Sequence, residues 1–504
     1  MMRFKKFCAG LAALCMMCAV VPVLPVQETA VISVSAEGEE TEYTYEKFRY
    51  KKYADYIEIS GMTEKITEVN IPAEIDGLPV TNIGNYAFAY FPELTSVTIP
   101  DSVTSIGEGA FFLSRLTSVT IPDSVTSIGD FAFRCEMTSI VVSENNPAYT
   151  SENGVLFNKE KTILIAYPAG NTRTEYMIPS GVTSIERLAF SGCSGLTSVT
   201  IPDSVTSIGI QAFYSCSGLT SVTIPDSATS IGWGAFEECS SLTSVTIPES
   251  VTSIETRTFS ETPWLKAKQE ENPLVIVNHI LIDGATCEGD VIIPESVTSI
   301  GGGAFSHSEL TSVTIPESVT SISDSTFWHC HELTAVTTPD SVTSIGEHAF
   351  YSCSVLTSVI IPESVTSIGS CAFGYCSGLT SVTIENPDCE IYDSEDTINN
   401  YSGTNNYSGT IYSYENSTAQ AYAEKYGYNF EVIGSAPETT EPTETETSAP
   451  VEPAEDMVWN GVNPDINRDG TIDAADSAIL LTYAAEFGAG KVTSFKEFMD
   501  KYYS

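Results

Sequence analysis

Basic residues are scarce in this sequence. Its 504 residues include 22 Lys and Arg against 66 Asp and Glu, which gives a formal net charge of −44 at pH 7. Proteins that bind nucleic acids use Lys and Arg to neutralise phosphates, and a field of this sign repels phosphates instead. We therefore exclude nucleic acid as a partner and expect a basic partner or a divalent cation.

Long apolar runs are also scarce, apart from one at the N-terminus. Three basic residues precede an apolar stretch over residues 7–24, and small residues at 34–36 suit a cleavage site. This pattern predicts a signal peptide over residues 1–36 and a secreted mature protein that starts near Glu37. An uncleaved membrane anchor is the alternative, although the run is short for a span. No later segment is apolar enough to cross a bilayer.

Histidine is rare as well, with five in the chain, and none lies beside a recognisable Ser or Cys nucleophile motif. His329, Cys330 and His331, with His307 one repeat earlier, form the one patch of metal-ligand residue types. Their spacing matches no tetrahedral zinc pattern, so we expect solvent-facing loop residues. We do not expect an enzyme, because such uniform repeats leave few unusual residues for a catalytic cleft.

The dominant feature is an internal repeat. The unit LTSVTIPDSVTSIGxxAFxxCSG recurs every 23 residues, with two shorter copies and several partial ones, which makes about eleven turns. Full copies begin at Leu196, Leu219, Leu242, Leu310, Leu333, Leu356 and Leu379, and the 22-residue copies begin at Leu94 and Leu116.

Each unit has the pattern of two short strands and a compact turn. In the unit that begins at Leu196, apolar residues alternate over 196–201 and predict a strand. Pro202, Asp203 and Ser204 predict a turn, and residues 205–208 predict a second extended piece. Gly209 ends that piece, before Ala212, Phe213 and Cys216 close the unit. One unit cannot bury its own apolar faces, so the copies must stack into a continuous solenoid.

This unit resembles the BspA-type leucine-rich repeat, which is found on bacterial surface proteins. The resemblance covers residues 66–390, with apparent insertions at 141–176 and 260–290. It implies a leucine-rich-repeat parallel β solenoid or horseshoe with short turns. Residues 37–65 would form an N-terminal cap. Residues 391–434 would form a C-terminal cap made of a short amphipathic helix and a last strand.

Ten cysteines remain once the signal peptide is removed, and most recur at one repeat position. Examples are Cys193, Cys216 and Cys239, and then Cys330, Cys353 and Cys376. Aligned thiols of this kind are most simply a buried ladder of small apolar side chains. Disulfides between turns and a metal site are the alternatives.

Two regular surfaces could carry function. Thr and Ser residues such as Thr95, Ser96 and Thr98 recur between the strand hydrophobes, either as strand formers with hydroxyl ladders or as a polar contact face. An acidic residue also follows the proline of each turn, either as turn chemistry in a solvated rim or as a row that cations bridge. These acids are Asp101, Asp123, Asp203, Asp226, Glu249, Glu295, Glu317, Asp340 and Glu363.

The composition changes at Ser435 into a Pro/Thr/Glu linker over residues 435–456, and a calcium-loop pattern follows it. Side-chain oxygens at loop positions 1, 3, 5 and 12 are the ligands that Ca²⁺ takes in such loops. The predicted ligands are Asp465, Asn467, Asp469 and Asp476, with the carbonyl of Thr471 and with Asp473 acting through water. An amphipathic helix is expected over residues 474–486.

The loop, the helix and the linker before them resemble a dockerin, and the segment 490–499 is similar to the ending of ruminococcal dockerins. A typical dockerin has two calcium loops, and residues 457–504 contain one, so the module is apparently half a dockerin. The resemblance implies a cohesin domain of a scaffoldin as partner, with Ala474 and Ala475 at the contact positions.

These features together predict a secreted, non-catalytic binding or adhesion protein. Its repeats would bind a protein or a glycan, and its calcium-dependent tail would attach it to a cell-surface or cellulosomal assembly. A cellulosome-associated component that degrades polysaccharides through an unrecognised active site is the alternative, and a structural spacer is the third possibility.

Overall fold

The strands of the protein form where the repeat places β-branched residues. A computed structural model describes residues 41–400 and 407–434, which belong to one compact unit. The predicted signal peptide, the linker and the calcium-binding module lie outside the described residues. No helix in the described part is long and apolar enough to span a membrane.

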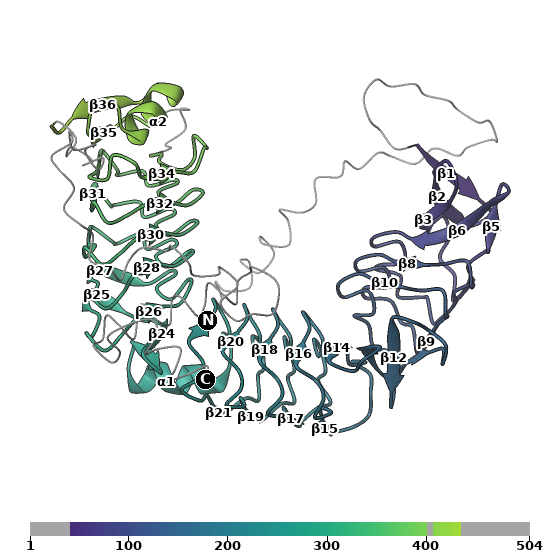
Figure 1. Ribbon diagram of the computed structural model, residues 1–504. Helices are drawn as coiled ribbons and strands as arrows, with labels where there is room; N and C mark the ends of the chain where they lie inside the picture. Colours follow the sequence, from purple (N-terminus) through teal and green to yellow (C-terminus); the bar gives the residue numbers. More distant parts are fainter. Residues whose placement is uncertain (1–40, 401–406, 435–504) are drawn as a thin grey trace, which may run out of the picture. The chain divides into compact units, whose positions relative to one another are not determined.

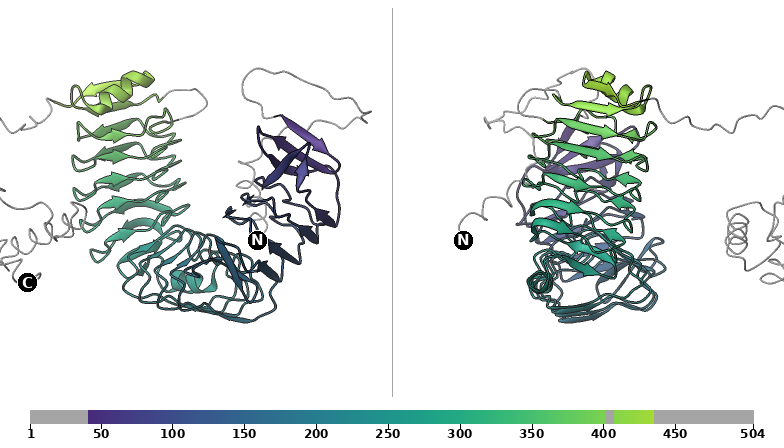
Figure 2. Two further views of the ribbon diagram at one scale, coloured as in Figure 1. Left: turned by 45° about the vertical axis from the view of Figure 1, so that its right-hand side comes forward. Right: turned by 90° about the vertical axis from the view of Figure 1, so that its left-hand side faces the viewer.

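Two rows of short parallel strands run along the stack, as Figures 1 and 2 show. Within a row, each residue pairs with its equivalent in the next turn. Val222 of one turn lies opposite Val245 of the next in the first row, and Ile208 lies opposite Ile231 in the second. This register keeps identical side chains in line, as the constant repeat length requires.

The first row contains strands of three to six residues, many of which have the Ser-Val-Thr pattern. These are β4 (Glu68–Asn70), β7 (Ser96–Thr98), β9 (Ser118–Ile121), β11 (Ser139–Val142), β15 (Glu175–Met177), β17 (Ser198–Thr200), β19 (Ser221–Thr223), β21 (Ser244–Thr246), β25 (Glu288–Ile292), β27 (Glu309–Thr314), β29 (Ala335–Thr337), β31 (Ser358–Ile361), β33 (Ser381–Ile384), β35 (Thr410–Ser413) and β36 (Asn429–Val432).

The second row contains mostly Ser-Ile strands of two residues. These are β3 (Ile57–Met62), β6 (Leu78–Ile83), β8 (Ser105–Ile106), β10 (Ser127–Ile128), β14 (Ile163–Ala166), β16 (Ser184–Ile185), β18 (Ser207–Ile208), β20 (Ser230–Ile231), β22 (Ser253–Ile254), β24 (Ile280–Asp283), β26 (Ser299–Ile300), β28 (Ser321–Ile322), β30 (Ser344–Ile345), β32 (Ser367–Ile368) and β34 (Glu390–Ile391).

The remaining elements lie in the segments that depart from the repeat. They are β1 (Glu42–Tyr45), β2 (Phe48–Lys52), β5 (Glu74–Ile75), β12 (Tyr149–Glu152), β13 (Val155–Asn158), α1 (Pro263–Glu271), β23 (Val275–Val277) and α2 (Thr418–Tyr426). Ser417 caps α2 by accepting a bond from the Gln420 N–H, and Gly427 ends it in the left-handed conformation. The helix α2 and the strand β36 thus occupy the segment where a helix followed by a strand is expected.

The stack has about 16 turns, which corrects the count of eleven made from the repeats. The expected insertions add antiparallel strands to the stack, and each also contributes one strand to the second row: β14 pairs in parallel with β16, and β24 with β26. At the N-terminal end, β3 pairs in parallel with β6. A parallel ladder is made of backbone hydrogen bonds, so these segments extend the stack without the consensus side chains.

The core is formed by the side chains that recur in every unit. The Ala-Phe pairs and their Leu, Val and Ile companions are buried, and they gather in three successive clusters along the chain. Phenylalanine rings stack from turn to turn, with centroids 4.7 Å apart for Phe190 and Phe213 and 5.0 Å apart for Phe213 and Phe236.

The cysteine ladder is confirmed as part of this core. All ten cysteines of the described residues are free thiols, and nine of them are buried. The thiol of Cys216 donates to the carbonyl of Phe190 at 3.0 Å, and that of Cys239 donates to Phe213 at 3.1 Å. Burial raises the pKa of Cys376 to about 12, so this thiol stays protonated and unreactive.

Candidate binding surface

Many hydroxyl groups of the Thr and Ser face are hydrogen-bonded to the neighbouring turn of the stack. The hydroxyl of Thr197 donates to the carbonyl of Thr174 at 3.0 Å, and that of Thr220 donates to Thr197 at 3.2 Å. Thr95 makes the same bond to Thr67, while Ser96 and Thr98 are exposed. The hydroxyl ladders account for much of this face, which leaves fewer groups free to specify a ligand.

The acidic row is a solvated rim. All nine predicted carboxylates are exposed in the structure. In most turns the serine that follows the acid donates to the preceding turn, as Ser204 does to the carbonyl of Val182 at 2.5 Å. Across the described residues, no group of three or more His, Cys, Asp or Glu side chains could hold a metal ion.

The repeat varies most beside the Ala-Phe pair, along a third surface that we call the Ala-Phe edge. It consists of the two residues before Ala and the two after Phe in each turn, which are residues 210, 211, 214 and 215 in the unit that begins at Leu196. Two of the four have a left-handed backbone, with φ +52° at Gln211 and +57° at Ser215. Such φ values are costly for residues other than glycine. Hydrogen bonds to the next turn hold them, as between the N–H of Gln211 and the carbonyl of Trp233 at 2.7 Å.

Aromatic side chains gather on this edge in the first half of the stack. Tyr86 and Phe131 have ring centroids 5.9 Å apart, Tyr90 and Phe112 lie at 5.4 Å, and Phe112 and Phe131 lie at 5.8 Å. Tyr86 is 44% exposed and Tyr90 is 55% exposed, as a binding surface requires. These residues come from successive turns, so a contiguous surface forms from positions about 22 residues apart.

Two arginines belong to this first cluster. The guanidinium of Arg134 lies 5.3 Å from the ring centroid of Phe112 and 5.5 Å from that of Tyr214, and Arg187 lies 5.7 Å from Phe131. These distances suit cation–π attraction. Burial lowers the pKa of Arg134 from its ordinary value, which means that part of its hydration has been removed.

A second cluster lies on the same edge in later turns. Trp328 contacts His307 and His329, with centroids 4.7 and 4.1 Å away, and Tyr351 lies 5.9 Å from His329. Burial, with His307 and His331 next in effect, lowers the pKa of His329 to about 4, so its imidazole is neutral at physiological pH. Nδ1 of His329 lies 3.3 Å from Nε2 of His331. The expectation of solvent-facing residues holds for His307 and His331, whereas His329 is half-buried and Cys330 is buried in the core.

The sequence alone did not identify the first cluster, and of the second it indicated the patch of His307, His329 and His331 without the aromatic side chains around it. The expected sites were sought among the repeated residues, whereas the aromatic and arginine side chains occupy the positions that differ between repeats. The available signal was the frequency of Tyr, Trp, His and Arg at those positions. The predicted calcium ligands Asp465, Asn467, Asp469, Thr471, Asp473 and Asp476, and the contact residues Ala474 and Ala475, lie outside the described residues.

The chain matches the model of one repeat family. The family described as "BspA type leucine rich repeat region (6 copies)" matches residues 61–173, 166–279 and 286–398, more than half of the chain. A solved leucine-rich repeat protein from Eubacterium ventriosum is 26% identical, over 61% of this chain and 92% of that one, with a TM-score of 0.34. A leucine rich cell surface protein from Faecalibacterium prausnitzii is 27% identical, over 73% of this chain and 100% of that one, with a TM-score of 0.32. None of the curated proteins compared with the chain matches it.

Proposed function

Because the chain belongs to the BspA-type leucine-rich repeat family, we propose that it is a non-catalytic binding protein that holds a protein ligand on its Ala-Phe edge. Proteins built from leucine-rich repeats bind protein ligands and are generally not catalysts. The observation that carries the proposal is the gathering of Tyr, Trp, Phe and Arg side chains on this edge. These residue types dominate the binding energy of protein interfaces.

The composition of the other surfaces supports this choice of edge. The first strand row presents mainly Thr and Ser, many of whose hydroxyls bond to the neighbouring turn, and the rim presents solvated carboxylates. Groups that are already hydrogen-bonded or fully hydrated add little to affinity. The half-buried aromatic and arginine side chains of the edge can lose their remaining water with little ordering cost, because stacking already holds them in place.

We also propose how the protein is exported and attached outside the cell. Residues 1–36 would direct export, and the linker over 435–456 would separate the solenoid from the tail. The tail would bind Ca²⁺ through Asp465, Asn467, Asp469, Thr471, Asp473 and Asp476. The dockerin resemblance supports attachment to a cohesin on a cell-surface or cellulosomal scaffoldin through Ala474 and Ala475.

Affinity capture with matched variants tests the binding role. The full-length mature protein is immobilised and exposed to culture supernatant and to host or plant extracts, and retained proteins are identified. The edge variant replaces Tyr86 and Tyr90 with Ser. The control variant replaces Met177 and Ile360 with Ser, because these apolar residues of the first strand row are 75% and 61% exposed.

We expect the edge variant to lose the captured protein and the control variant to retain it. Loss in the control variant alone would place the ligand on the strand face instead. Release of reducing ends from plant polysaccharides by the purified protein would contradict the non-catalytic assignment.

A further inference from the structure

The stack is interrupted inside the first aromatic cluster. The second strand row stops at β10, and the next sheet begins with the β12–β13 hairpin and β14. Among the described residues, no backbone hydrogen bond joins the Ala-Phe turn of residues 129–135 to residues 165–167. The hydroxyl of Tyr149 fills part of the gap by accepting a bond from the Ile128 N–H at 3.0 Å.

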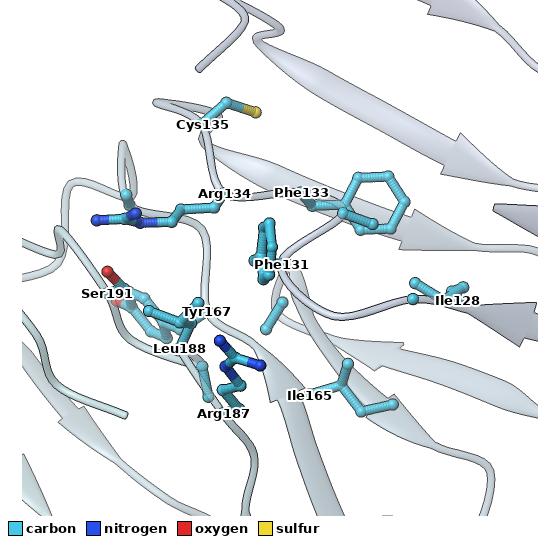
Figure 3. Close-up of a pocket in the computed structure, with 15 residues that line it drawn as sticks. Ile128, Phe131, Phe133, Arg134, Cys135, Ile165, Tyr167, Arg187, Leu188 and Ser191 are labelled. Carbon is cyan, nitrogen blue, oxygen red and sulfur yellow. The ribbon is translucent and has the colours of Figure 1, made fainter. Parts of the chain in front are cut away.

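A small pocket opens at this interruption, on the Ala-Phe edge. Its volume is about 30 Å³, and Arg134, Arg187, Phe131 and Ser191 are among the residues that line it. Figure 3 shows the two arginine side chains and Ser191 around it, with the ring of Phe131 nearby. The lining combines apolar walls with a few polar groups, as small-ligand sites do.

The charge of Arg134 lacks an acidic partner. Glu238 favours its charged form through space, but in the part of the chain that the structure describes no carboxylate forms an ion pair with Arg134. Arg187, in contrast, lies 3.5 Å from the carboxylate of Asp130. Arg134 is also half-buried, so water hydrates its guanidinium only in part. Burying a charge without a partner is costly, so an anion at this place would be stabilised.

Ser191 gives independent evidence for a polar ligand. It is 4% exposed, lines the pocket, and its hydroxyl has no hydrogen-bond partner within the protein. A buried hydroxyl without a partner costs about 1–3 kcal/mol. An oxygen atom of a ligand in the pocket would satisfy it.

We propose that this pocket binds the carboxylate of an Asp or Glu side chain of the protein ligand. The planar guanidinium of Arg134 would donate two parallel hydrogen bonds to the carboxylate, and Ser191 would donate a third. Phe131, which lines the pocket, would pack against the methylene groups of the same side chain. This assignment rests on the proposed function, because it names the chemistry that the edge recognises.

The test follows the guanidinium signals of Arg134 and Arg187, which both line the pocket, by NMR in full-length protein labelled at arginine; Arg187 reports binding in the Arg134 variant. The probe is N-acetylglutamate methylamide, and the neutral analogue N-acetylglutamine methylamide is the control ligand. Arg134→Met identifies the signal and should abolish binding. Ser191→Ala should weaken binding by about tenfold, since a hydrogen bond to a charged group is lost. Arg115→Met is the matched control, because Arg115 is exposed and does not line the pocket.

We expect a saturable shift of the Arg134 signal with the glutamate probe, no such shift with the glutamine analogue, and an unchanged response in Arg115→Met. Equal shifts with both probes, or binding that survives Arg134→Met and Ser191→Ala, would overturn the assignment. Tighter binding of glucuronate than of the glutamate probe would overturn it in favour of an acidic sugar. If the pocket fails these tests while the Tyr86 and Tyr90 variant still loses its captured protein, the proposed function stands without the pocket.

Discussion

The stacked phenylalanines make a sharp test of how stability is distributed along the solenoid. Phe213 is fully buried, and its ring lies between those of Phe190 and Phe236. Replacing a buried Phe with Ala costs about 3–5 kcal/mol, and the loss of two ring contacts places Phe213→Ala toward the upper end of that range. In a solenoid each turn contacts its neighbours only, so the loss should stay near the altered turn.

Native-state hydrogen exchange measures this distribution directly. Phe213 belongs to the core cluster that runs from Val155 to Ile280, whereas Phe350 belongs to the cluster that begins at Leu281. We expect Phe213→Ala to speed exchange mainly in turns of the first of these clusters. The matched variant Phe350→Ala should speed exchange in the second. Equal loosening of all turns by either variant would refute nearest-neighbour stacking.

Three further predictions concern the cysteines, a histidine and the tail. The mature protein, denatured without reductant, should react with about ten equivalents of a thiol reagent, matching the ten free cysteines; thiols that appear only after reduction would indicate disulfides. The pKa of His329 is lowered to about 4 in the folded protein, so as the pH falls its imidazole is protonated in the unfolded chain before it is protonated in the folded protein. The free energy of unfolding should therefore fall as the pH drops from about 6.5 to about 4, and His329→Gln should remove that part of the pH dependence in denaturation curves. Calorimetric titration of the full-length chain with Ca²⁺ should give binding heat that Asp469→Ala weakens without changing the melting of the solenoid; an unaltered chain that gives no heat would sink the calcium-loop prediction.

The repeating part of the fold could be predicted from the sequence because the same apolar residues recur at the same spacing in every copy of the unit. Each turn must bury Leu, Val, Ile, Ala and Phe at fixed positions, so the two strands and the compact turn follow from their spacing. The burial of Cys216 and its equivalents followed in the same way. The number of turns could not be read from the consensus, because strands such as β14 and β24 lie in segments without the repeat pattern and still pair in parallel with the next turn.

The Ala-Phe edge, where we propose that the ligand binds, was harder to predict for a related reason. Its side chains come from variable positions, which a repeat consensus discards. Their proximity depends on the left-handed residues that turn the chain beside each Ala-Phe pair, as at Gln211. The pocket depends on the gap between β10 and β14, which falls at the expected insertion over residues 141–176, but the break in the repeat pattern does not reveal that a pocket forms there.

Hydroxyl-radical footprinting of the protein with its captured ligand tests most directly the claim that the Ala-Phe edge is the binding surface. Tyr90, Trp328 and Tyr351 report on the edge, while Met177 and Ile360 report on the first strand row in the same sample. The account predicts that the ligand protects at least one of the aromatic clusters from oxidation and leaves Met177 and Ile360 as reactive as in the free protein. Protection of Met177 and Ile360, with the edge aromatics unchanged, would contradict it.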